Sequence, residues 1–390
     1  MENQDRNITV EEGSVHGPDK KLKPYAKMAL IEFRLRLEKS IQANDLFDNM
    51  HITRKIDKCH SKADLREDVI DKRDISLWGV PLLPSEDHEG TDVILLKFLR
   101  ARDFKVLEAF ELLQKTLIWR REFGTDGIVE EDFGRDLKNV AFLDGSDKQG
   151  QPLSYIVYGA FKDKDLYQSM FGCVDNNSDK FVRWRVQCIE RGIENLNLKD
   201  GGINSIVHIT DLKDLYKYVP FWYYAYHALS SRMLTQRMKN KFIFARPSKV
   251  AKTLLKYIAP EYIPVQYGGL KRESDQEFTP SDQVSDATVE GGIIETIKFP
   301  ISEPGVTIVW DITVVGWDVT YQEEFIPDDE GSYKIVIQSE RKMSATVRSS
   351  YYINEPGKIQ LIITNNTFKK KKILYRSKFK PTIPMYVKIR

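Results

Sequence analysis

The stretch "PLSYIVYGA", residues 152–160, predicts a buried β-strand, because it is a short apolar run that is rich in aromatic and β-branched residues. After it the chain carries a helical pattern at 180–197, a strand "SIVHIT" at 205–210, a strand "KFIF" at 241–244 and a helical pattern at 249–258. Strands that alternate with helices are typical of a parallel sheet covered by helices. We therefore expect an α/β unit in the middle of the chain.

Two helices are predicted upstream of this unit, in "VILLKFLRARDFKVLEAFELLQKTLIWRREFG", residues 93–124. Apolar residues recur at helical spacing in both halves of the stretch. A short basic joint with Arg100 and Arg102 separates the halves, and Asp103 is the expected N-cap of the second helix.

A second, all-β unit is predicted at the C-terminal end. Residues 271–290 are polar and lack a period, which indicates a linker. In "VTIVWDITVV", residues 306–315, apolar and polar positions alternate, and turn signals divide the following sequence into short segments. This pattern predicts an antiparallel sandwich.

The composition indicates a cytoplasmic protein that is not inserted in a membrane. The 390 residues carry 59 Lys and Arg against 57 Asp and Glu, so no overall field attracts polyanions. No run of about 18 apolar residues occurs, and the beginning of the chain lacks an apolar signal region. Three cysteines without CxxC spacing favour a reducing compartment.

The sequence contains few residues in patterns typical of catalysis or metal binding. It contains no phosphate-binding glycine loop, no nucleophile elbow and no zinc-protease motif. His88-Glu89 lacks a second histidine, and His208 with Asp211 has no nucleophile beside it, so a solvated loop and a strand end are the better interpretations. We expect no enzyme activity, no metal and no cofactor.

The most basic part of the chain is its C-terminal end. From Lys369 to Arg390 there are nine Lys or Arg and no acidic residue. Such a run attaches proteins to anionic membranes at about 1 kcal/mol per residue in reach, and it equally prevents edge-to-edge association of a sheet. Nucleic acid ranks lower, because the rest of the chain offers no basic groove. The predicted membrane-facing residues are Lys369, Lys370, Lys371, Lys372, Arg376 and Lys378.

Several long segments, in order, closely resemble the plant patellins. They are the helical stretch at 93–124, "DKQGQPLSYIVYG", "KFIFARPSKVAKTLLKYIAPEYIPVQYGGL", "TIVWDITVVGWDVTYQEEF" and "KKKKILYRSK". The resemblance implies a multidomain fold: an α/β CRAL-TRIO lipid-binding domain with a helical N-terminal part, followed by an all-β, jelly-roll-like GOLD sandwich. It also implies a non-enzymatic, peripheral membrane protein that binds phosphoinositides and other hydrophobic ligands, meets trafficking proteins through its GOLD domain and acts in cell-plate formation and cytokinesis. The membranes implied are the plasma membrane, the endosomal membrane or the cell plate.

The domain limits expected from this resemblance follow the changes in composition. They are a polar N-terminal region with a helical segment at 1–75, CRAL-TRIO N-terminal helices at 76–135, the α/β domain at 136–272, a linker at 273–290 and the GOLD sandwich at 291–390.

The resemblance assigns an inositol-headgroup site to Arg100, Arg102 and Lys241. Arginine offers a two-pronged fork to a phosphate, and lysine a point charge. The alternative is that the two arginines only sit at a helix C-terminus, where the dipole favours cations.

The chain departs from the family pattern in "HITDLKDLYKYVPFWYYAYHAL", residues 208–229. Near residues 213–219 it is short of a helix and a sheet strand, and a crossover between parallel strands needs at least about ten residues. Phe221, Trp222 and Tyr223 match the family's lipid-pocket wall. Three hypotheses follow: a lipid-binding and transfer protein, a GOLD adaptor with an impaired pocket, or a splice or gene-model product whose α/β domain folds poorly.

Overall fold

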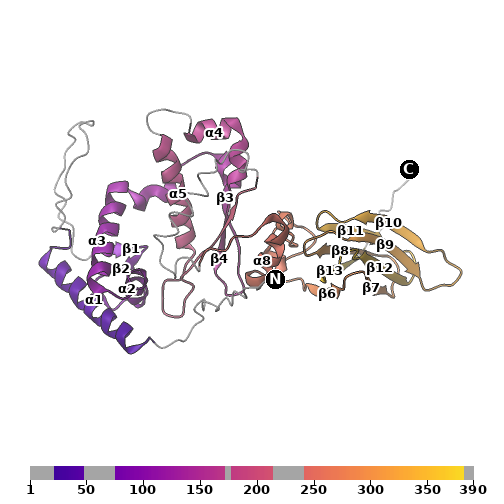
Figure 1. Cartoon of the computed structure of the whole chain (residues 1–390), viewed down its shortest axis with the longest axis horizontal. Helices are drawn as coiled ribbons and strands as arrows, with labels where there is room; N and C mark the ends of the chain where they lie inside the picture. The colour runs from indigo at the N-terminus through magenta and orange to yellow at the C-terminus, as the bar shows by residue number, and fades with distance from the viewer. Residues whose placement is uncertain (1–21, 48–74, 172–176, 214–240, 382–390) are drawn as a thin grey trace, which may run out of the picture. The chain divides into compact units, whose positions relative to one another are not determined.

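The structure of the chain is a computed structural model that describes residues 22–47, 75–171, 177–213 and 241–381 (Figure 1). It divides into two compact units, Met1–Gly145 with Gln149–Leu234 and Ser146–Lys148 with Thr235–Arg390. Each unit is described by itself.

Three helices open the first unit: α1 (Pro24–Ala43), α2 (Glu89–Ala101) and α3 (Val106–Phe123) (Figure 1). Their apolar stripes meet in one core, so the two helices predicted at 93–124 are confirmed. Its fully buried members include Phe33, Leu37, Leu95, Leu99 and Leu113. Short elements accompany the helices: β1 (Ser76–Leu77), β2 (Val80–Pro81), η1 (Pro84–Glu86), η2 (Thr125–Glu130) and η3 (Arg135–Asn139).

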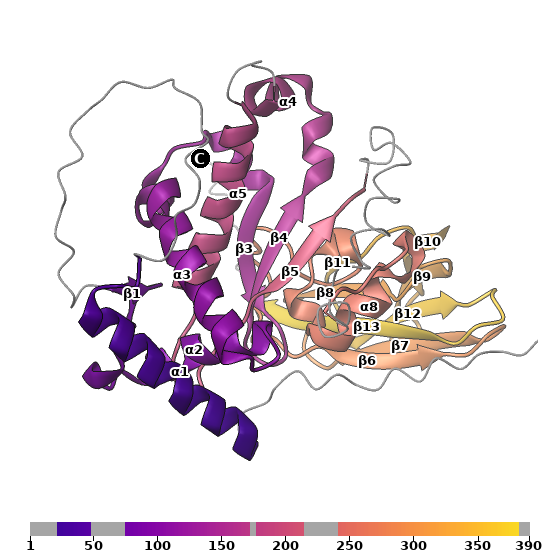
Figure 2. The same ribbon diagram turned by 60° about the vertical axis from the view of Figure 1, so that its left-hand side comes forward.

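A three-stranded sheet in the order β3-β4-β5 follows, and Figure 2 shows its strands side by side. The strands are β3 (Ala141–Ser146), β4 (Pro152–Val157) and β5 (Val207–Asp211), and the accompanying helices are η4 (Tyr158–Lys162), α4 (Lys164–Phe171) and α5 (Asn177–Glu194). β4 and β5 are parallel, with Leu153 opposite Val207, as the alternation of strands and helices predicted. β4 buries both faces, whereas β5 is an edge strand of the described sheet.

The strand predicted at 241–244 is wrong. These residues form no regular element, and Phe242, Ile243 and Phe244 are 52%, 55% and 71% exposed. A strand needs a neighbour that satisfies its amides, and the family pattern supplies that neighbour from the segment that is short here. After this segment come η6 (Pro247–Lys249), α8 (Val250–Tyr257), η7 (Pro260–Tyr262) and η8 (Val265–Tyr267).

The rest of the second unit is the expected antiparallel sandwich, with one sheet in the order β10-β9-β12-β7 and the other in the order β11-β8-β13-β6 (Figure 1). Its strands are β6 (Ser285–Val289), β7 (Ile294–Ile301), β8 (Val306–Val314), β9 (Thr320–Pro327), β10 (Ile335–Lys342), β11 (Val347–Tyr352), β12 (Gly357–Thr364) and β13 (Lys371–Pro381). The inner face of β8, including Trp310 and Ile312, forms the core with Tyr321 and Phe325 of β9.

The linker predicted at 273–290 is wrong in large part. β6 pairs with β13 over five positions, from Val289 opposite Lys371 to Ser285 opposite Tyr375. Phe278 is buried, and Asp275 is held by two arginines of the sandwich. Polar composition misled the prediction, because β6 is an edge strand of the sandwich and exposes alternate polar side chains, as a linker also would. The sandwich therefore begins before residue 291.

Candidate headgroup and membrane-binding sites

The basic joint between α2 and α3 is a tight turn. Arg100 lies half-buried in the last turn of α2, and Arg102, the C-cap residue, is exposed. Asp103 and Phe104 adopt left-handed backbone with φ of 49° and 62°, and the amide of Phe104 donates to the carbonyl of Leu99 at 2.7 Å.

Asp103 does not cap α3, contrary to the prediction. The N-cap residue is Lys105, which makes no capping hydrogen bond through its side chain. Its amine instead lies 2.8 Å from the Glu108 carboxylate. The hydrogen bond from Lys105 to Glu108 raises the pKa of this lysine.

Neighbouring contacts hold the joint in place. The ring of Phe104 packs edge-on against Tyr25 at 5.3 Å between centroids. One turn earlier, the Lys97 amine donates to the carbonyl of Asn204. The last turn of α2 offers its negative dipole end to Arg100, as the helix-terminus alternative requires. Arg102 is exposed, and its guanidinium donates to the Ala101 carbonyl at 3.3 Å.

The third predicted headgroup residue, Lys241, is exposed and stands directly before the apolar residues 242–244. It belongs to the second unit, and the two arginines belong to the first. The predicted pocket wall, Phe221, Trp222 and Tyr223, lies outside the described residues.

Lys370 and three lysines of β13 have acidic neighbours from residues 277–290. Lys370 lies 3.1 Å from Glu290, Lys372 lies 3.1 Å from Asp286, and Lys378 lies 3.5 Å from Asp282. Lys380 likewise pairs with Glu277. These pairs are exposed or partly exposed and individually weak, but they compensate much of the charge of the basic strand.

Two of the six predicted membrane-facing residues are not freely exposed. Lys371 is half-buried and donates to the carbonyls of Trp317 and Asp318, and its burial lowers its pKa. Arg376 is 3% exposed and cannot face a membrane. Its place in the alternation of β13 turns it toward a buried carboxylate, Asp311, to which its Nε donates at 2.9 Å. Lys369 remains exposed at the start of the run.

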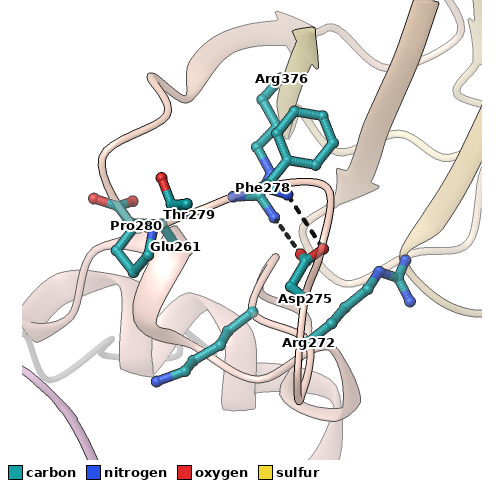
Figure 3. Close-up of a pocket in the computed structure, with 8 residues that line it drawn as sticks. Glu261, Arg272, Asp275, Phe278, Thr279, Pro280 and Arg376 are labelled. Carbon is teal, nitrogen blue, oxygen red and sulfur yellow. Dashed lines mark hydrogen bonds and ion pairs between the residues drawn. The ribbon is translucent and has the colours of Figure 1, made fainter. Parts of the chain in front are cut away.

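Arg376 belongs to a buried ion cluster with Asp311 and Asp275, and Figure 3 shows its guanidinium beside Asp275 and Phe278. Asp311 is fully buried and also accepts two hydrogen bonds from Arg348, at 2.8 and 2.7 Å. Asp275 accepts from both arginines, and the ring of Phe278 covers both guanidinium groups at 4.3 and 5.1 Å from its centroid. A cleft of about 190 Å³ beside the cluster is lined by Lys271, Arg272 and Glu261 among others.

The cluster joins the end of the CRAL-TRIO sequence to the sandwich. Arg376 donates to the Leu270 carbonyl at 2.9 Å, and the Thr346 hydroxyl donates to the Gly269 carbonyl at 2.9 Å. Sequence reasoning missed the cluster, although one signal was present: Asp311 is the one charged residue of the strand at 306–315, and a buried carboxylate requires cationic partners.

No group of three or more metal-ligating side chains occurs in the described part of the chain. Among the described helices, none is long and apolar enough to span a membrane.

The CRAL/TRIO N-terminal domain matches residues 35–115, and the CRAL/TRIO domain matches 137–218 and 215–269. The Patellin-1-like C-terminal GOLD domain matches residues 290–371. With the α/β unit and the sandwich, these matches define the class: a CRAL/TRIO protein that carries a GOLD domain.

The chain is similar to Patellin-4 of Arabidopsis thaliana, with 45% identity over 80% of this chain and 63% of the relative. It is 42% identical to Patellin-6 of the same plant, over 76% of this chain and 80% of the relative. A phosphatidylinositol transfer protein SFH5 of Cryptococcus neoformans is 38% identical over 31% of this chain and 41% of the relative. The chain belongs to the patellin family. It spans 63% of Patellin-4 and 52% of Patellin-5.

The comparisons also bear on the departure near residues 213–219. The CRAL/TRIO domain matches as two segments that meet at 215–218. The comparison with Patellin-4 extends over 348 positions but covers only 80% of this 390-residue chain, which is fewer residues than 348. Patellin-4 therefore contains residues within the compared region that have no counterpart here. Both findings agree with an internal deletion.

Proposed function

We propose that this chain is a non-enzymatic protein that binds a phosphoinositide or another hydrophobic ligand and transfers or presents it at a membrane. One observation carries the proposal: Lys241 is followed by three consecutive large apolar residues that are more than half exposed. Soluble proteins cover such patches with a ligand or a partner. A phospholipid fits both parts of this segment, because its acyl chains are apolar and its headgroup is anionic.

The headgroup contacts that we propose in the first unit are Arg100 and Arg102, and the one that we propose in the second unit is Lys241. The rigid turn at the α2–α3 joint presents an exposed guanidinium, and a guanidinium binds phosphate through two parallel hydrogen bonds. Membership of the patellin family and the similarity to a phosphatidylinositol transfer protein support an inositol phospholipid as the ligand.

A transfer assay between vesicles tests this proposal with the full chain. The double variant Arg100→Ala/Arg102→Ala is expected to lower phosphatidylinositol transfer by about tenfold or more, because two charge-assisted contacts are lost. Lys115→Ala, which removes an exposed lysine from α3, is the matched control and should transfer like the wild type. Transfer by the double variant at the wild-type rate would contradict the headgroup assignment.

The second candidate is a GOLD adaptor whose lipid pocket is impaired. The two-segment CRAL/TRIO match and the absence of a strand at 241–244 among the described residues favour it. Mass spectrometry of lipid extracted from the purified protein separates the two candidates. Bound phospholipid supports the first, and vesicle binding without bound lipid or transfer supports the second.

We further propose a cytoplasmic, peripheral location at the plasma membrane, endosomes or cell plate, with a role in trafficking during cytokinesis. The support is family membership alone. Imaging of a fluorescently tagged chain in dividing plant cells tests it, and exclusion of the protein from these membranes would contradict it.

A further inference from the structure

Two turns meet at one end of the GOLD sandwich. The first joins β6 to β7 at residues 290–293, and the second joins β12 to β13 at 365–370. Lys371 pairs with Val289 and Thr364 pairs with Ile294, so both turns cross between the sheets at the same end. In Figure 2 the second turn lies beyond the arrowhead of β12. We call residues 290–294 and 365–370 the sandwich tip.

Asn365 fastens the two turns together. Its side chain is fully buried and donates to the carbonyls of Glu290 at 3.0 Å and Lys369 at 2.8 Å. Its backbone amide donates to the Ile293 carbonyl at 3.1 Å, and its own carbonyl accepts from the Gly292 amide at 2.8 Å. These bonds give the tip a fixed shape.

The second turn also lies directly on Gly291. A Cβ at this position would stand 2.6 Å from the carbonyl carbon of Phe368, so the close approach requires glycine. The backbone of Phe368 is therefore held in place against Gly291, while its ring points away from the sandwich and is fully exposed. Ile293 and Ile294, on the neighbouring turn, are also more than half exposed.

The tip combines this apolar group with positive charge. Phe368 directly precedes four lysines, Lys369 to Lys372. Glu290 and Asp286 pair with two of them, and the side chains of these pairs are half or more exposed, so an excess of positive charge remains. Exposed apolar side chains beside lysines are typical of surfaces that enter the boundary between headgroups and acyl chains.

We propose that the sandwich tip inserts Phe368, Ile293 and Ile294 into an anionic phospholipid bilayer, with the adjacent lysines on the headgroup phosphates. The inference rests on the proposed membrane association and assigns it a site that does not involve the lipid pocket. A bilayer fits better than a protein partner, because three apolar side chains on two turns are far smaller than a standard protein interface of about 1,600 Å².

Co-sedimentation with vesicles of phosphatidylcholine and phosphatidylserine in equal amounts tests the proposal on the full chain. Phe368→Ala is expected to weaken binding about tenfold, whereas Phe368→Leu keeps most of it. Tyr333→Ala is the matched control: Tyr333 is 89% exposed at the other end of the sandwich, in a turn that contains Asp328, Asp329 and Glu330, and its loss should change nothing. Because Phe368 is fully exposed, unfolding temperatures should match the wild type.

Insertion of the residue 368 side chain into the bilayer can also be measured directly by fluorescence quenching. In Phe368→Trp, brominated acyl chains are expected to quench more fluorescence than in the wild type, which has six tryptophans. Wild-type vesicle binding by Phe368→Ala, or no added quenching in Phe368→Trp, would overturn the inference. A wild-type chain that binds vesicles through Phe368 but carries no lipid would instead contradict the proposed transfer function and leave the tip intact.

Discussion

At the scale of single residues, Asp311 is the central carboxylate of the buried ion cluster in the second unit. It is fully buried and accepts from Arg348 and Arg376. Asp275 supplies the second carboxylate of the cluster. A buried charge is tolerated only when it is paired and hydrogen-bonded, and here the ring of Phe278 also shields both guanidinium groups from water.

Asp311→Asn is expected to destabilise the sandwich by about 3–5 kcal/mol, because it leaves two largely buried arginines with one carboxylate. Hydrogen exchange of the β8 and β13 amides measures the free energy of unfolding of this unit. Lys372→Ala, which removes only the exposed pair with Asp286, should cost about 1 kcal/mol or less. Equal effects of the two variants would contradict the role given to the buried cluster.

The cluster also predicts how stability depends on pH. Burial raises the pKa of Asp275, but hydrogen bonds from Arg348 and from the amides of Glu277 and Phe278 outweigh it and lower the pKa well below its ordinary value. A lowered folded-state pKa contributes stability that is fully present above the unfolded-state pKa of about 4 and is lost as the pH falls further.

Unfolding by urea at a series of pH values is therefore expected to show the stability of the sandwich falling below about pH 4. Asp275→Asn should be less stable at neutral pH and should show a shallower acid dependence. An unchanged slope in that variant would mean that other carboxylates cause the acid sensitivity.

At the scale of elements, the segment between α8 and β6 connects the end of the CRAL-TRIO sequence to the sandwich. Two stretches of its backbone approach closely at Gly269, where a Cβ would stand 2.0 Å from the carbonyl oxygen of Ile263. The Gly269 carbonyl accepts a hydrogen bond from Thr346, in the turn before β11, and the Leu270 carbonyl accepts one from Arg376 of β13. The close backbone approach sets the position of both carbonyls.

Gly269→Ala is expected to destabilise the second unit by about 1–3 kcal/mol, because the clash is with backbone that cannot move independently. The measurement is the urea midpoint of the purified chain. Gly331→Ala, in an exposed turn where the nearest atom to a Cβ is 3.4 Å away, is the control and should change stability by less than about 0.5 kcal/mol. A midpoint for Gly269→Ala equal to that of the control would show that the crossing relaxes freely.

At the scale of the whole molecule, the main departure from the family lies within the CRAL/TRIO domain, where its two matching segments meet. The described sheet ends at β5, the segment at 241–244 forms no strand, and the family match breaks between these elements. All three features agree with the internal deletion near residues 213–219.

The segment that Patellin-4 has and this chain lacks can be inserted between Lys213 and Val219. We expect this insertion to restore a neighbour for the strand predicted at 241–244. Amides of residues 241–244 should then exchange more slowly, and phosphatidylinositol transfer should rise about tenfold or more over the original chain. An insertion of the same length made of Gly and Ser is the control and should change neither quantity. Transfer at the same rate in both insertion proteins would contradict the impaired-pocket hypothesis.

The sequence by itself determined the family, the two N-terminal helices, the parallel pairing of β4 with β5 and the sandwich, because these depend on local periodicity and on order along the chain. Only the tertiary structure decided which polar groups are buried. Arg376 turns inward because Asp311 on the neighbouring strand requires a cation, and the acidic residues 277–290 pair with β13 instead of forming a linker. Phe368 and Ile293 come together across 74 residues only because β6, β7, β12 and β13 pair at one end. Such long-range pairings leave no periodic signal in the sequence.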